Sequence, residues 1–90
     1  EEALRIGLLK QVVPVAEFDA AVSAYAQMVC ENAPLTLAAA KRSLLELRKA
    51  SAERDIEAVK AMVDACFSSE DYKEGRNAFA EKRTPQFQGH

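Results

Sequence analysis

Apolar residues recur at helical spacing along most of the chain, and this pattern predicts three helices. The stripe of the first helix, between residues 17 and 31, consists of Phe18, Val22, Tyr25 and Val29. Intervals of four, three and four place these side chains on one face of an α-helix. Similar stripes predict further helices over residues 34–50 and over residues 51–67 with Ser51 as the cap, and a helix-start signature predicts a fourth helix over residues 70–83.

The residues before the first predicted helix have a different pattern. Residues 1–6 resemble the last turns of a helix, and Gly7 follows them, as glycine often does where a helix ends in the left-handed conformation. Residues 8–13 form a short β-branched run that Pro14 stops, which predicts one extended segment. Because a lone strand cannot satisfy its own backbone, we expect this segment to pair with a segment outside this chain or to pack as a loop.

The last predicted helix carries two local features. Residues 68–71 read Ser-Ser-Glu-Asp, which predicts a hydroxyl cap with a carboxylate that also bonds the helix start. Gly75 lies in the helix interior, where glycine costs about 1 kcal/mol relative to alanine. We therefore expect a packing contact that leaves no room for a Cβ at Gly75. Residues 84–90 are predicted to form an extended tail.

Charge and composition exclude several classes of function. The 90 residues carry a net charge of -2 without a run of like charge, whereas nucleic acids and anionic membranes attract dense cationic patches. No apolar stretch approaches the ~20 residues of a membrane span. We expect no nucleic-acid or membrane partner and a cytoplasmic location. Cys30 and Cys66 lack the spacing of a metal or redox motif, so we expect them to be small core residues.

Few residues could carry chemistry. The single histidine, His90, lies at the end of the sequence, and no pattern indicates a catalytic or metal-binding set. One cluster remains, in which Arg76, Phe79, Lys82 and Arg83 share a helix face. Cations beside an exposed aromatic ring can bind a ligand with phosphates and a stackable base. The alternative is that the phenylalanine belongs to the core and the basic residues favour the negative helix end.

The sequence resembles a known family along its whole length. Residues 69–89 read SEDYKEGRNAFAEKRTPQFQG and resemble the closing segment of the enoyl-CoA hydratase/isomerase (crotonase) superfamily, S-E-D-x-x-E-G-x-x-A-F-x-E-K-R-x-P-x-F-x-G. Residues 2–14 are similar to its A-x-x-x-G-L-V-x-x-V-V-P passage, and residues 33–42 are similar to its linker helix. The three segments occur in the family's order.

The resemblance implies an all-α C-terminal segment of a crotonase-like fold. Residues 1–14 would end a preceding spiral core, and residues 15–90 would form a helical region that mediates trimerisation and covers an active site. In the family, the spiral domain supplies the oxyanion hole and the catalytic carboxylates. The chain alone would therefore have no catalytic residue and no activity.

The resemblance also implies a ligand and partners. Phe79 and Lys82 match family positions near the adenine and the 3′-phosphate of CoA, in the same or a neighbouring subunit. The parent enzyme would act on a CoA thioester without a covalent cofactor, and it would be a homo-oligomer, either a trimer or a dimer of trimers. An enoyl-CoA hydratase or isomerase is expected, although this fold also supports other reactions. The alternatives are a non-enzymatic helical protein-interaction module and a small acyl-CoA carrier.

Overall fold

The computed structural model describes residues 1–90 and contains α-helices but no β-strand. The helices are α1 (Glu2–Arg5), α2 (Phe18–Cys30), α3 (Pro34–Leu47), α4 (Ile56–Ser68) and α5 (Glu70–Glu81). Short 3-10 turns precede α2 and α4, namely η1 (Val15–Glu17) and η2 (Ser51–Glu53). The all-α prediction and the four longer helices are thereby confirmed.

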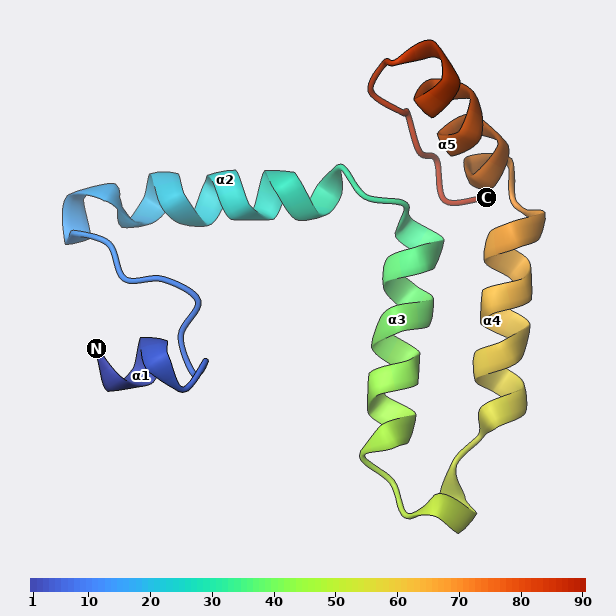
Figure 1. Ribbon diagram of the computed structural model, residues 1–90, viewed down its shortest axis with the longest axis horizontal. Coiled ribbons are helices and arrows are strands. Elements are labelled where there is room, and N and C mark those ends of the chain that lie inside the picture. The colour runs from blue at the N-terminus through green and yellow to red at the C-terminus, as the bar shows by residue number, and fades with distance from the viewer.

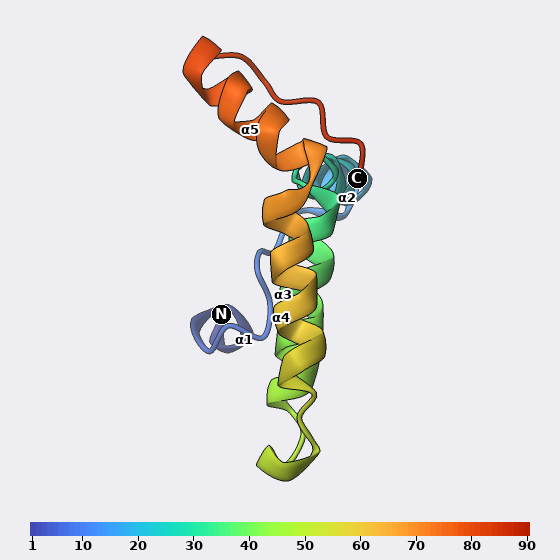
Figure 2. The same cartoon turned by 90° about the vertical axis from the view of Figure 1, so that its right-hand side faces the viewer.

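The helices form a flat and open arrangement of 44 × 43 × 18 Å. α3 and α4 run antiparallel and side by side, and α5 continues from the end of α4 (Figure 1). α2 extends away from the start of α3 at the opposite side from α4 (Figure 1). The view along the edge shows α3 and α4 overlapping in one thin layer, with α1 beside it (Figure 2).

This arrangement encloses little core. Only 5 of 90 residues are buried, and the apolar ones among them are Ala39 and Ala78. The accessible surface is 7422 Å², whereas a compact protein of this mass exposes about 5200 Å². The radius of gyration is 17.1 Å, against about 12 Å for a compact chain of this length. The chain therefore exposes about 2200 Å² more surface than a compact protein of the same mass.

The stripe of α2 illustrates this exposure. Phe18, Val22 and Tyr25 are all exposed, because α2 projects away from α3, α4 and α5 (Figure 1). The expectation that both cysteines are core residues is wrong for this chain, since Cys30 on α2 is exposed and Cys66 on α4 is half-buried. The sequence pattern identifies the apolar face correctly, but nothing within residues 1–90 covers it.

The N-terminal segment ends a helix as predicted. Gly7 follows α1 with φ of +74°, which is the left-handed conformation that glycine adopts readily. Residues 8–13 form an irregular segment, with the Leu9 amide donating to the Ala3 carbonyl at 3.0 Å. Within residues 1–90 this segment is a loop, and its pairing with a segment outside this chain stays a prediction. The Lys10 ammonium lies 3.7 Å from the centre of the Tyr25 ring, which joins this loop to α2.

The predicted cap of α4 is wrong. Asp55, not Ser51, caps the helix, because its Oδ1 accepts the Ala58 amide at 2.9 Å. Ser51 instead begins η2, which separates it from the first turn of α4. The sequence contains both a serine and an aspartate as potential caps, and the intervening 3-10 turn decides between them.

Glu46 joins α3 to the start of α4. Its side chain is almost fully buried, and its carboxylate accepts a hydrogen bond from the Lys49 ammonium at 2.7 Å and one from the Asp55 amide at 2.9 Å. Arg42 Nε lies 2.8 Å from the same carboxylate. The Lys49 hydrogen bond, followed by the Asp55 amide, holds the pKa of Glu46 below its ordinary value. The ionised carboxylate thus fixes the turn between the two helices.

None of the helices is both long and apolar enough to span a lipid bilayer.

Candidate functional site

The two residues that the sequence singles out lie at the C-terminal end of α5. Phe79 is 87% exposed, so the interpretation of this ring as a core residue is wrong for this chain. Lys82 directly follows the helix, and its side chain is exposed and forms no ion pair. The helix end therefore presents an aromatic ring and a cation, three residues apart, to the surroundings.

The backbone at this helix end reverses direction. Lys82 adopts φ of 54° and ψ of 40°, and it is the only non-glycine residue with positive φ. The Arg83 amide donates to the Ala78 carbonyl at 3.0 Å, and the Lys82 amide donates to the Phe79 carbonyl at 3.3 Å. These two bonds form the Schellman arrangement, in which glycine commonly occupies the position that Lys82 holds here.

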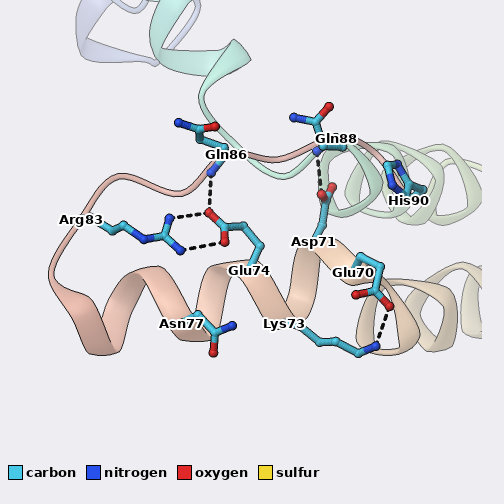
Figure 3. Close-up of a pocket in the computed structure, with 9 residues that line it drawn as sticks. All are labelled: Glu70, Asp71, Lys73, Glu74, Asn77, Arg83, Gln86, Gln88 and His90. Carbon is cyan, nitrogen blue, oxygen red and sulfur yellow. Dashed lines mark hydrogen bonds and ion pairs between the residues drawn. The ribbon is translucent and has the colours of Figure 1, made fainter.

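Arg83 does not share the face of Phe79 as a free cation, which corrects that part of the prediction. Its Nη1 and Nη2 donate to the two carboxylate oxygens of Glu74 at 2.6 and 2.8 Å (Figure 3). Its Nε donates to Glu81 at 2.6 Å. The reversal at Lys82 directs the chain back along α5, and this brings Arg83 beside Glu74, two turns earlier in the helix.

The charges of this pair stabilise each other. The Arg83 hydrogen bonds, followed by the bond from the Gln86 amide at 2.8 Å, lower the pKa of Glu74 to about 2. The carboxylates of Glu74 and Glu81 in turn raise the pKa of Arg83. Glu74 is thus held ionised at neutral pH, which makes it a poor proton donor.

Arg76, the fourth member of the predicted cluster, points to a different neighbour. Its guanidinium lies 5.9 Å from the centre of the Tyr72 ring, within the range of a cation–π contact. Tyr72 in turn meets Phe67 edge to face, with 5.3 Å between the ring centres. Arg76 and Arg83 thus interact with other residues, and of the predicted cluster only Phe79 and Lys82 remain as an exposed ring and an exposed cation at the end of α5.

The tail of residues 84–90 folds back along α5. Asp71, only 4% exposed, accepts the Gln88 amide at 2.6 Å and the Gly89 amide at 2.8 Å (Figure 3). The Asp71 amide donates to the His90 carbonyl at 3.0 Å. The tail is extended, as predicted, but its docking through Asp71 and Glu74 was not anticipated from the sequence.

The predicted helix start is confirmed in one half only. Ser69 Oγ accepts the Tyr72 amide at 3.0 Å and so caps α5. The carboxylate expected to complete the cap is that of Asp71, which bonds the tail instead.

The contact over Gly75 differs from the prediction. Phe87 packs there, but a Cβ on Gly75 would lie 3.4 Å from Phe87 Cε1, which is ordinary van der Waals contact. The interpretation that the site has no room for a Cβ is wrong, although the packing contact itself exists.

The groove between α5 and the tail is polar, and its carboxylates are not suited to act as general acids. It is lined by polar and charged side chains alone, including those of Glu70, Asp71, Glu74 and His90 (Figure 3). Catalytic carboxylates need burial or a close like charge to raise their pKa, and the partners of Glu74 act in the opposite direction. Nothing in the groove could surround an acyl chain with apolar groups.

A second hollow is apolar. It measures about 520 Å³ and lies between the loop of residues 9–13 and α2, with Phe18, Val22 and Tyr25 among its walls. It belongs to the same exposed face of α2 described above.

Comparison with known sequences gives one consistent result. The sequence model of the enoyl-CoA hydratase/isomerase family matches residues 1–90. The chain is 40% identical over 92 residues to the methylmalonyl-CoA decarboxylase of Escherichia coli K12. It is 34% identical over 89 residues to the (E)-benzylidenesuccinyl-CoA hydratase of Thauera aromatica. These matches cover 100% and 99% of this chain, but 35% of each relative.

Solved structures agree with the sequences. A probable enoyl-CoA hydratase/isomerase from Mycobacterium abscessus superposes with a TM-score of 0.79 at 34% identity, over 99% of this chain and 35% of its own. An enoyl-CoA hydratase from Mycobacterium tuberculosis H37Rv superposes with a TM-score of 0.80 at 35% identity, over 98% and 35% of the two chains. The chain thus spans about a third of the length of the proteins that it matches.

Proposed function

The chain belongs to the enoyl-CoA hydratase/isomerase family, and we propose that it is the C-terminal third of an enzyme that acts on a CoA thioester. The matched relatives named above are a decarboxylase and a hydratase of CoA thioesters, so the shared feature is the CoA moiety rather than the reaction. Among the reactions of such enzymes we propose that of a hydratase or isomerase, after which the matching family is named. The catalytic groups would lie in the part of the protein that precedes this chain.

Within that enzyme, Phe79 and Lys82 bind the nucleotide end of CoA. The observation that carries this assignment is a phenylalanine ring that is 87% exposed at a helix end, next to a lysine without an ion pair. An exposed ring can stack on adenine, and an ammonium can bind the 3′-phosphate. Base stacking on an aromatic side chain contributes about 1–3 kcal/mol, and an exposed charge pair contributes about 0.2–1 kcal/mol.

The rest of the exposed apolar surface forms contacts with the preceding domain and with neighbouring subunits. The excess of about 2200 Å² is the size that an obligate interface buries, rather than the size of a transient one. The unpartnered faces of α2 and the adjoining loop fit this role because they are continuous and apolar. The assembly that we propose is a homo-oligomer, either a trimer or a dimer of trimers.

Calorimetric titration of the full-length protein with CoA tests the site. We expect Phe79→Ala to weaken binding by about fivefold to 100-fold, and Lys82→Ala to weaken it by about twofold to fivefold. Lys73→Ala is the matched control, because Lys73 is an exposed lysine on the same helix that pairs with Glu70. Unchanged affinity in both site variants would refute the assignment. A wild-type protein that does not bind CoA would favour the protein-interaction module instead.

A further inference from the structure

The conformation of Lys82 requires an explanation, because a lysine is unfavourable there. In the left-handed region the Cβ crowds the following carbonyl, which is why glycine is usual at this position. Such a conformation persists where the surrounding contacts fix it. The contacts in question lie on the residue that follows, Arg83, whose amide bonds the Ala78 carbonyl and whose guanidinium bonds Glu74.

The ion pair of Arg83 and Glu74 holds the chain reversal in place across the helix end. Two parallel hydrogen bonds of 2.6 and 2.8 Å define both the position and the plane of the guanidinium. Glu74 lies on α5 itself, so the bonds join the residue after the reversal to the helix before it (Figure 3). The Gln86 amide donates to the same carboxylate at 2.8 Å, which adds a second attachment beyond the reversal.

The direction of the Lys82 side chain follows from this arrangement. If residue 82 were right-handed, α5 would continue and its Cβ would point along the next helical position. In the left-handed conformation, rotation about the N–Cα bond of Lys82 turns its Cβ away from that helical position. The side chain of Phe79 starts from a residue inside the helix, so its direction does not change. The relative placement of the ring and the ammonium therefore depends on whether the reversal is held.

We propose that Glu74 is a positioning residue for CoA: by holding Arg83 it fixes the left-handed Lys82 and so places the ammonium for the phosphate of the nucleotide. This inference rests on the proposed CoA site at Phe79 and Lys82. Glu74 itself does not touch the ligand and acts only through Lys82. Its role is distinct from that of Asp71, whose carboxylate accepts hydrogen bonds from the tail amides of Gln88 and Gly89 and none from Arg83.

A double-mutant cycle in the full-length protein tests this role, with CoA affinity measured by calorimetry. Glu74→Gln removes the carboxylate charge and the bidentate pair but keeps the side-chain size and the helix propensity. We expect it to weaken CoA binding by about twofold to fivefold, the same range as Lys82→Ala. In the Lys82→Ala background, Glu74→Gln should have no further effect, because the ammonium that it positions is gone. A purely structural role would weaken binding equally in both backgrounds.

Two further variants keep the result interpretable. Arg83→Lys retains the positive charge but lacks the bidentate fork, so it should reproduce the loss and the coupling even if Glu74→Gln folds poorly. Glu70→Gln is the matched control, since Glu70 lies one turn earlier on α5 and pairs only with Lys73. It should leave CoA affinity unchanged.

The outcomes separate this inference from the proposed site. If Lys82→Ala has no effect, the lysine contact of the proposed site is refuted, and the positioning role fails with it, whereas the Phe79 contact is judged by Phe79→Ala. If Lys82→Ala weakens binding but Glu74→Gln and Arg83→Lys do not, the positioning role alone is refuted. Persistence of their effects in the Lys82→Ala background would refute it equally. The positioning role is supported if each single variant loses CoA affinity and the double variants bind CoA as weakly as Lys82→Ala alone.

Discussion

Replacing Asp71 by alanine should release the tail from α5. The Asp71 carboxylate accepts two backbone amides, those of Gln88 and Gly89, at 2.6 and 2.8 Å, in a position that is 4% exposed. A hydrogen bond to a charged acceptor contributes about 1.5–3 kcal/mol. Once the tail lifts, both amides can bond water, so the loss stays below the sum of two such bonds. We expect tail docking to weaken by about 2 kcal/mol, which corresponds to about 30-fold.

Amide hydrogen exchange in the full-length protein measures this change directly. The protection of the Gln88 and Gly89 amides should fall by about 30-fold in Asp71→Ala, while amides within α3 keep their wild-type rates. Asp71→Asn should give an intermediate result, because the amide oxygen of asparagine can still accept one N–H group. Asp64→Ala is the control, as Asp64 is an exposed carboxylate on α4 whose side chain has no hydrogen bond.

The reasoning would be refuted if the tail amides of Asp71→Ala exchanged at the wild-type rate. In that case the docking would depend on Phe87 and on the Glu74 contacts rather than on the Asp71 carboxylate.

Three other predictions concern stability and pH. Gly75→Ala should increase the free energy of unfolding by up to about 1 kcal/mol, because alanine favours the helix and the added Cβ would meet Phe87 at an ordinary distance. The urea midpoint should rise accordingly, and a lowered midpoint would contradict this. The pKa of Glu74 is lowered from its ordinary value of 4.5 to about 2. The ionised carboxylate therefore contributes fully to the stability of the fold above pH 4.5, and this contribution is lost as the pH falls towards 2. Thermal unfolding between pH 5 and 2, compared with Glu74→Gln, should show a smaller loss in the variant, and identical curves would count against the pair. Finally, Asp55→Ala should destabilise the protein by about 1 kcal/mol in urea titrations, whereas Ser51→Ala should change stability by less than about 0.5 kcal/mol; the reverse order would restore Ser51 as the cap.

The sequence predicted the helices well because helix formation depends on local patterns. Stripes of apolar residues located α2, α3 and α4, and the Ser-Ser-Glu-Asp signature located the start of α5. The cap of α4 was misplaced because Ser51 and Asp55 are both good capping residues, and only the intervening 3-10 turn distinguishes them.

The docked tail could not be predicted in the same way. Asp71 and Glu74 accept hydrogen bonds from backbone amides more than ten residues away, and every residue other than proline has such an amide. The position of Arg83 depended on the left-handed conformation of Lys82, which a lysine does not indicate. Charge spacing on an ideal helix therefore placed Arg83 on the wrong face.

Exposure was the remaining difference between expectation and structure. An apolar stripe shows that a face will be covered, but not by what. For Phe18, Val22 and Tyr25 no cover exists within residues 1–90. For Phe79, which is also exposed, we propose contact with a ligand instead.

The central claim is that Lys82 at the end of α5 contacts the 3′-phosphate of CoA. The ratio of the dissociation constants for 3′-dephospho-CoA and CoA, measured with the full-length protein and its Lys82→Ala variant, tests this contact most directly. We predict that the wild-type protein binds CoA about twofold to fivefold more tightly than 3′-dephospho-CoA, and that the variant binds both with equal affinity. A variant that keeps the wild-type ratio would contradict the account.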